Sequence, residues 1–438
     1  MRAIFLFVMA AATAAMSAGA ADLTATVRRK DVDAHAGPSL ESEKLARLDR
    51  DATVAIAAQH GLWYELKLTD GRTAYVRVND VRVNYAGAED GSANLRALTT
   101  GKAGAGRVSE TAGVRGIEES DLQAAAMDQA QFDAMIGYQS DPPAAEAYAA
   151  ERGWQATRVA FESEGKQGKG SQSSMSGSSG ALQGATGMLG SLGSKVGSFL
   201  GTAERVAPRP EEELAAEELA LGPEIAGRVL GARPLLDDAG TQQRVNVVGR
   251  WVASQTSRPD LPWAFGVIDS PEVNAFAAPG GYVLMTRGLY ELLTSDSEVA
   301  AVLAHEISHC VERDHYSVIR KQEVATVGQE MVSGQIDTGG NEAVAFARQY
   351  VEQHGATIML TSLDRQAEYR ADQAAEIYLA RSGMNPMALY SVLQRMASLG
   401  KQSASLAAVY KTHPPLDARM DKIDERGYEK LRAYVTRE

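Results

Sequence analysis

The strongest constraint on this chain is a run of helix-forming residues that carries two histidines four positions apart. Between Glu298 and His309, apolar residues recur at helical spacing and no proline interrupts them. This pattern predicts a buried helix. Residues four apart lie on one face of a helix, so the imidazoles of His305 and His309 can bind the same metal ion, with Glu306 beside its open coordination position.

The chemistry of this spacing favours zinc. Zn²⁺ binds imidazole nitrogen, and its catalytic sites keep one coordination position open. We expect one Zn²⁺ per chain, with Glu306 as the general base that takes a proton from zinc-bound water and returns it to a leaving amine. The alternative is that the spacing arose by chance, in a chain with only 7 histidines.

Two residues compete as the third metal ligand. His315 follows His305 by ten positions, the metzincin spacing, but that motif needs glycine for a sharp exit from the helix and this chain has Glu312 there. Glu368 would come from a later helix, and Asp372 one turn further on could accept a hydrogen bond from a ligand histidine. We favour Glu368 and keep His315 as the alternative.

Several motifs in a fixed order resemble one family over residues 211–425. They are Asn274-Ala275-Phe276, Pro279-Gly280-Gly281, His305-Glu306-Ile307-Ser308-His309, Glu368 to Asp372 and Thr412-His413-Pro414-Pro415. This set is similar to the gluzincin family of HtpX, Oma and CAAX-prenyl proteases, and it looks closest to the soluble periplasmic branch. The repeat domain common in that branch is not expected after Glu438. Partners that dock on such repeats are therefore not predicted for this chain.

The resemblance implies roles for single residues. Glu368 would be the third ligand, Asp372 its supporting acid, His413 an oxyanion stabiliser and Arg419 a residue near the site. His413 also precedes two prolines that favour an extended loop, and its imidazole is itself a competent zinc ligand. We therefore expect that this loop can close the open zinc position and leave the enzyme latent.

One segment of this region has a β-like pattern. Residues 274–286 contain a Pro-Gly-Gly turn flanked by extended runs. By resemblance, this is the edge strand on which such enzymes align an extended peptide, a pairing that reads the peptide backbone. The predicted substrate-strand residues are Asn274, Phe276, Gly280 and Gly281.

The N-terminus predicts export. Residues 1–20 begin with Arg2, continue with an apolar stretch and end in small residues, which is typical of a signal peptide cleaved after Ala20. A membrane anchor is the alternative, but the apolar run is shorter than a spanning helix needs. The single cysteine, Cys310, excludes an intramolecular disulfide. We expect a periplasmic or otherwise extracytoplasmic protein with no stable membrane span after cleavage.

Residues 21–88 alternate in the manner of short strands separated by turns, which favours a small all-β barrel. This region resembles bacterial SH3-like domains through Gly37-Pro38-Ser39, Gly61 to Leu66 and Asp70 to Val76. Such a domain would bind an envelope or peptidoglycan ligand. Trp63 and Tyr64 would form its groove, unless they are half-buried barrel aromatics.

The remaining sequence predicts a multidomain chain. Residues 89–163 form a helical or irregular connector, with amphipathic helix over 119–150, and residues 164–210 form a Gly/Ser-rich linker. A membrane-contacting helix over 182–200 is the alternative for part of that linker. Residues 211–438 form a mainly α, α+β domain of the zincin metallopeptidase type.

Charge and motif together limit the function. A net charge of −12 argues against nucleic-acid binding, because phosphates select basic surfaces. We expect an exported zinc-dependent metalloendopeptidase that cleaves unfolded or misassembled envelope proteins. The alternative is a metal-containing chaperone or assembly factor that binds clients through the edge strand and the SH3-like domain. Glu306 favours the enzyme, because a purely structural zinc site has no need of a base.

Overall fold

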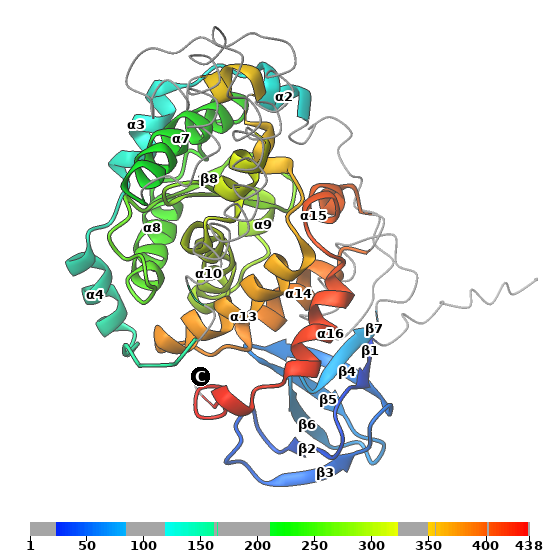
Figure 1. The fold of residues 1–438 in the computed structure, drawn as a ribbon. Helices are drawn as coiled ribbons and strands as arrows, with labels where there is room; N and C mark the ends of the chain where they lie inside the picture. The colour runs from blue at the N-terminus through cyan, green and yellow to red at the C-terminus, as the bar shows by residue number, and fades with distance from the viewer. Residues whose placement is uncertain are drawn as a thin grey trace, which may run out of the picture.

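The computed structural model describes most of the chain, and its seven N-terminal strands precede a larger, mainly helical region (Figure 1). The described residues are 23–84, 119–161, 164, 211–322, 349–354, 356–400 and 403–436. The predicted signal peptide and nearly all of the predicted linker lie outside them. Among the described residues, no helix is both long and apolar enough to cross a membrane.

Residues 24–84 form an antiparallel sheet, called the N-terminal sheet below. Its strands are β1 (Thr24–Val27), β2 (Val32–His35), β3 (Lys44–Leu48), β4 (Thr53–His60), β5 (Trp63–Lys67), β6 (Thr73–Arg77) and β7 (Val81–Asn84), in the spatial order β3-β2-β6-β5-β4-β1-β7. The alternation found in the sequence places Ile56, Leu66 and Val76 in its core.

The prediction of a closed barrel is wrong, because no described pairing joins β3 to β7. β2 meets β6 through a single residue pair, His35 with Tyr75, and its pairing with β3 is shifted at Ala34 and His35. The edge at β7 is covered by a helix of the following region instead of by β3. The SH3-like identity of this sheet stays a prediction.

The two aromatic residues proposed for a ligand groove differ in their burial. Tyr64 is only 1% exposed and belongs to the core of the N-terminal sheet, so it is unavailable for a groove. Trp63 is half-buried, with its ring edge-to-face against His35.

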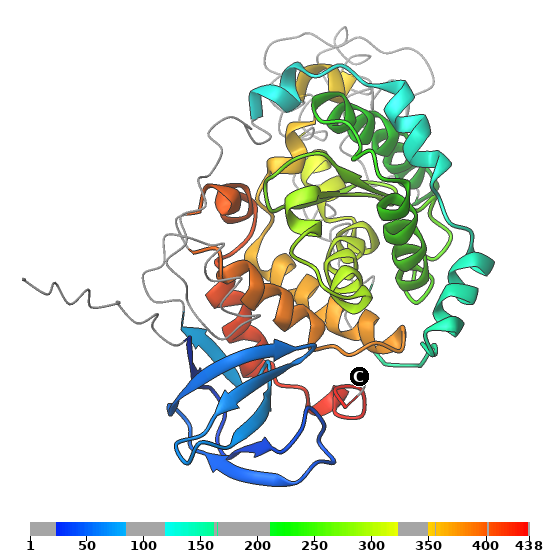
Figure 2. The same cartoon turned by 180° about the vertical axis from the view of Figure 1, so that it is seen from behind.

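The region expected to contain amphipathic helix forms three helices, α2 (Glu119–Ala124), α3 (Gln129–Gly137) and α4 (Pro142–Glu151). The carboxylates of Asp128 and Asp141 accept hydrogen bonds from the first turns of α3 and α4, so each acid begins a new helix. Their apolar residues Leu122, Phe132 and Met135 are buried in the core of the helical region. These three helices therefore cover the outside of that region (Figure 2).

The C-terminal region is mainly helical, as the sequence predicts, and its helices surround a three-stranded sheet. Its elements are α7 (Glu211–Ala232), α8 (Ala239–Ala253), β8 (Ala264–Ile268), β9 (Ala275–Ala278), β10 (Tyr282–Thr286), α9 (Arg287–Tyr290), α10 (Asp296–Glu312), η1 (Thr357–Leu360), α13 (Arg365–Arg381), α14 (Ala388–Ala397), η2 (Ala404–Leu406), α15 (Ala407–Thr412), α16 (Leu416–Arg426) and η3 (Glu429–Leu431). β10 lies between β8, to which it runs parallel, and the edge strand β9.

Helix α10 lies at the centre of this region, packed against α8, α13, α14 and β9 (Figure 1). Ser295 caps its N-terminus by accepting a hydrogen bond from the backbone of Glu298. Every residue from Glu298 to Glu312 is buried. The helix ends at Arg313, whose φ of 57° lies in the left-handed region.

A buried carboxylate holds the end of α10 in place. Glu218 of α7 accepts hydrogen bonds from both terminal nitrogens of Arg258 and from Nε of Arg313, each at 2.8 Å. The backbone N–H of Gly280, in the turn between β9 and β10, also donates to Glu218 at 3.3 Å. Glu218 therefore joins three segments that are far apart in the sequence.

We predict that Glu218→Ala lowers the free energy of unfolding by about 3–5 kcal/mol, because it leaves two arginines without their buried partner. Urea denaturation of the full chain measures the change. Glu212→Ala is the matched control, since Glu212 lies exposed on the same helix. Equal stability of the two variants would contradict a structural role for Glu218.

Candidate metal centre and active site

The two histidines of α10 face each other at one end of a buried site. Their Nε2 atoms are 3.3 Å apart, and both residues are almost fully buried. Their spacing of four residues places them on the same side of the helix. Both imidazoles therefore direct a nitrogen toward one point, as the sequence predicts.

Glu368, in the first turn of α13, lies against this pair. Its carboxylate oxygens are 3.6 Å from Nε2 of His305 and 3.7 Å from Nε2 of His309. Glu368 is 1% exposed, and its Oε2 has no hydrogen-bond partner among the described residues. Burying an unpaired carboxylate oxygen is costly unless another group compensates its charge.

The three side chains fit a bound divalent metal. Bonds of 2.0–2.2 Å in a tetrahedral arrangement place neighbouring ligand atoms about 3.3–3.6 Å apart. The Nε2–Nε2 and Nε2–oxygen separations here, 3.3 to 3.7 Å, lie close to that range. A cation at their centre would also compensate the unpaired oxygen of Glu368.

Each histidine is oriented by a buried acid on its other ring nitrogen. Nδ1 of His305 lies 3.1 Å from Asp372, one turn beyond Glu368 on α13. Nδ1 of His309 lies 2.9 Å from Asp314. Burial opposes ionisation of both acids, but neighbouring arginines and hydrogen bonds hold their pKa values below the ordinary range. Such acids fix the ring orientation and leave Nε2 free for a metal.

Two arginines hold these acids in turn. Nε of Arg419, on α16, donates to Asp372 at 3.0 Å, and a terminal nitrogen of Arg419 lies 3.3 Å from Nδ1 of His305. Arg370 donates to Asp314 at 2.7 Å. Arg419 is therefore next to the site, where the resemblance placed it.

The carboxylate of Glu306 is buried beside the metal ligands. It is 4% exposed, and burial raises its pKa. Glu306 lines the same cavity as His305. It is separate from the cluster of candidate ligand atoms, so it remains available for proton transfer.

His413 brings a third imidazole to the site. It follows α15 in an extended conformation, and its Nε2 lies 3.6 Å from Glu368. The candidate ligand atoms of His305, His309, Glu368 and His413 all lie within 4.8 Å of one another. Burial lowers the pKa of His413 to about 3, so the imidazole is neutral near pH 7 and can offer a lone pair to a metal.

Comparison with known proteins places this geometry in a family. Residues 239–427 match the model of peptidase family M48. This part of the chain belongs to family M48. The predicted resemblance to HtpX and Oma proteases is thereby confirmed. The N-terminal sheet lies outside the match.

Individual relatives of the M48 domain share about a quarter of its residues. Over 211 residues, 47% of this chain, it is 26% identical to the beta-barrel assembly-enhancing protease of Escherichia coli strain K12 and covers 42% of that protein. Over 195 residues, 44% of this chain, it is 27% identical to the mitochondrial metalloendopeptidase OMA1 of Schizosaccharomyces pombe and covers 56% of it. A protease HtpX homolog of Sulfurovum sp. is 27% identical over 210 residues, 40% of this chain and 73% of that protein. The match thus spans less than half of the Escherichia coli relative.

His315, the alternative third ligand, lies apart from the cluster of candidate ligand atoms in the M48 domain. Its ring centroid is 5.9 Å from that of His309, and burial lowers its pKa to about 4. The left-handed turn at Arg313 takes the chain away from α10 immediately after Glu312. The geometry therefore brings Glu368 to the histidine pair and leaves His315 beside it.

The predicted substrate strand forms one edge of the M48 sheet. β9 pairs only with β10 among the described strands. Asn274, just before β9, is 1% exposed, and neither polar atom of its side-chain amide has a hydrogen-bond partner among the described residues. Phe276 packs into the hydrophobic core, whereas its neighbour Ala275 lines the cavity next to His305. Gly280 and Gly281 form the turn with φ values of 78° and 100°, which glycine adopts most readily.

Asp314 is the site residue that sequence reasoning missed. It stands five residues after His309, a spacing that would not place both on one face of a continuous helix. It reaches the imidazole because the chain turns at Arg313. The available signal in the sequence was an acid shortly after the second histidine. It indicates a contact with His309 only if the chain is known to turn at Arg313.

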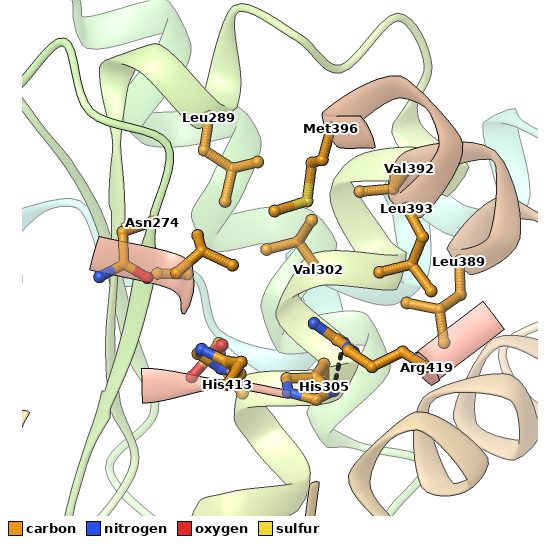
Figure 3. A pocket seen from close by; sticks show the side chains of 13 residues that line it. Asn274, Leu289, Val302, His305, Leu389, Val392, Leu393, Met396, His413 and Arg419 are labelled. Carbon is orange, nitrogen blue, oxygen red and sulfur yellow. Dashed lines mark hydrogen bonds between the residues drawn. The ribbon is translucent and has the colours of Figure 1, made fainter. Parts of the chain in front are cut away.

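An apolar cavity adjoins the histidines (Figure 3). Polar groups from Asn274, His305, Glu306, His413 and Arg419 lie along one side of it. The rest of its wall is apolar: Ala275, Leu289, Val302, Leu389, Val392, Leu393, Met396 and Val409. The cavity therefore combines a reactive floor with walls suited to a hydrophobic side chain.

We predict that Glu368→Ala sharply lowers metal content, whereas His315→Ala leaves it close to that of the unchanged protein. Loss of a ligand acts directly on metal affinity, while His315 lies outside the ligand cluster. Elemental analysis of both variants after dialysis measures the outcome. The reverse pattern would establish His315 as the ligand. Asp372→Ala should weaken affinity by a smaller factor, about 10- to 100-fold.

Proposed function

We propose that this protein is a zinc-dependent metalloendopeptidase. The observation that carries the proposal is the position of Glu306, buried in a cavity beside two histidines and a carboxylate that fit a metal. A site made only to stabilise the fold would need no such carboxylate and would close all its coordination positions with protein ligands.

The residues of the site account for peptide hydrolysis. Zn²⁺ bound by His305, His309 and Glu368 would act as a Lewis acid that lowers the pKa of a water molecule toward about 7. With the metal bound, Glu306 would accept a proton from the attacking water and would donate it to the departing amine. Burial makes Glu306 a stronger base than an exposed glutamate, because it raises the pKa of the carboxyl group.

The edge of the sheet would align the substrate. No described strand pairs with β9 on the side away from β10, so an extended peptide could pair there and recognition would rest mainly on the peptide backbone. The buried side-chain amide of Asn274, which has no hydrogen-bond partner in the part of the chain that the structure describes, can hydrogen-bond that backbone inside the cavity. Gly280 and Gly281 set the turn that returns β9 to β10.

The substrates we propose are unfolded or misassembled proteins of the cell envelope. The name of the Escherichia coli relative, beta-barrel assembly-enhancing protease, supports an envelope role. The apolar residues 4–12 and the small residues before position 21 support export to the periplasm. An edge strand that reads backbone requires an extended substrate, which folded proteins offer only in their exposed segments.

We predict that Glu306→Gln reduces proteolysis by ~10²-fold or more while one zinc per chain is retained, because general-base catalysis is worth about that factor. Casein digestion and elemental analysis of the same preparations measure both effects. Glu291→Gln, which changes an exposed carboxylate outside the site, is the control. Cleavage by Glu306→Gln at the unchanged rate would remove Glu306 from its role, whereas no cleavage by the unchanged protein would favour a non-enzymatic chaperone.

We further propose that His413 occupies the open metal position until substrate displaces it. Its neutral imidazole already lies among the candidate ligand atoms. His413→Ala should then raise basal turnover of a short unstructured peptide and speed zinc loss to a chelator. If His413 only stabilises the oxyanion, the variant should lower kcat instead. A lower kcat with an unchanged rate of zinc loss would contradict the blocking role.

A further inference from the structure

Helix α14 lies between the active-site cavity and the N-terminal sheet. One side of α14 carries Leu389, Val392, Leu393 and Met396, which line the cavity next to His305 (Figure 3). Their spacing of three and four residues places them on one face of the helix. The N-terminal sheet lies beyond the other side of α14, close to α16 (Figures 1 and 2). A displacement of α14 would therefore change the shape of the cavity.

Gln394 anchors α14 to the N-terminal sheet. Its Oε1 accepts a hydrogen bond from the backbone N–H of Val83 at 2.9 Å, and its Nε2 donates to the carbonyls of Val78 at 2.7 Å and Val81 at 3.2 Å. Gln394 is 1% exposed. Removing this amide would leave three backbone groups at the sheet edge without that partner, which is unfavourable in a buried position.

A second connection continues from the N-terminal sheet to the metal-binding helix. Gln59 of β4 donates to the hydroxyl of Ser391 at 3.0 Å, and that hydroxyl donates to Glu298 at 2.8 Å. Glu298 lies on α10, two turns before His305. α14 is thus fixed to the N-terminal sheet on one side and to α10 on the other.

A third contact binds the N-terminal sheet to α16. Arg82 of β7 donates to Asp424 at 2.7 Å and to the hydroxyl of Tyr390 at 3.1 Å. Tyr390 belongs to α14, and α16 also carries Arg419, which holds the acid behind His305. The N-terminal sheet therefore contacts two of the helices that contribute side chains to the cavity.

We propose that the N-terminal sheet sets the side-chain preference of the peptidase by holding α14 in position. The inference rests on the proposed function, since the cavity beside Glu306 is taken to receive a substrate side chain. The cavity measures about 40 Å³, room for only a few water molecules. Small movements of α14 would consequently decide how large a side chain fits. Gln394 is the positioning residue in this arrangement.

The test uses the full-length protein with Gln394→Met, which keeps the length of the side chain and removes its hydrogen bonds. Three quenched peptides differ only in the residue after the cleaved bond, which is Ala, Leu or Phe. We expect the ratio of kcat/KM values between the Leu and Ala peptides to change by ~5-fold or more, within the range that pocket contacts supply. Metal content should stay at the level of the unchanged protein.

Two further variants serve as the positive and the negative control for this measurement. Leu393→Ala enlarges the cavity directly and shows how far the ratio can move when its wall is changed. Arg72→Met is the matched control, because Arg72 is an exposed residue of the N-terminal sheet paired with Asp70. If Gln394→Met does not fold, Gln59→Met serves in its place, because it removes the hydrogen bond to Ser391 together with a local one to the carbonyl of Gly61.

A measurement independent of turnover separates this inference from the proposed function. Hydrogen exchange should become faster in residues 388–397 of Gln394→Met and stay unchanged in α8. Binding of the three peptides to Glu306→Gln and to Glu306→Gln/Gln394→Met reports the preference without cleavage. An equal loss for all three peptides, or an unchanged preference in a folded variant, overturns the inference. Absence of cleavage by the unchanged protein would instead contradict the proposed peptidase activity.

Discussion

The packing of α13 against α10 through buried carboxylates is the interaction on which the rest of the structure depends. Glu368 meets both histidines, and Asp372 contacts the far side of His305. Burying these acids is favourable only because the imidazoles and Arg419 compensate their charge, to which a bound cation would add. The carboxylates of α13 make the site costly to bury, but their contacts with the histidines also bring α13 and α10 together at this point.

Further charged residues extend this compensation outward. Arg370 donates a hydrogen bond to Asp314, the acid next to His309. At the end of α10, Glu218 accepts hydrogen bonds from Arg258 and Arg313. Through Gly280, Glu218 also reaches the turn of the edge strand. The metal-binding helix and the proposed substrate strand are therefore held by one buried carboxylate. Glu218 lies outside the region matched to family M48, so residues beyond the matched domain complete its framework.

The N-terminal sheet is joined to the helical region by specific polar contacts. Gln394 satisfies backbone groups at the edge of the sheet, where an unpaired strand would otherwise invite association with another chain. Ser391 is bonded to both the sheet and α10. These contacts explain how an open sheet remains stable next to a peptidase domain. They also place α14 between two parts of the protein that the sequence suggests are separate modules.

The sequence by itself determined those features that depend on neighbouring residues along the chain. The helix of His305 and His309, the turn at Gly280 and Gly281, and the strands between residues 24 and 84 all follow from local periodicity and turn chemistry. Glu368 could be proposed because its motif is recognisable, although its closeness to the histidines depends on how α13 packs.

Only the tertiary structure decided which distant groups meet. Asp314 reaches His309 through the left-handed turn at Arg313, and no periodic pattern encodes that bend. The open sheet was missed because its closure depends on whether β3 or α14 covers the edge at β7. A hydrogen bond between residues more than 300 positions apart, such as that of Gln394 with Val83, leaves no trace in local spacing. Local spacing limits which residues share a face of a helix or strand, whereas packing across the whole chain determines which faces come into contact.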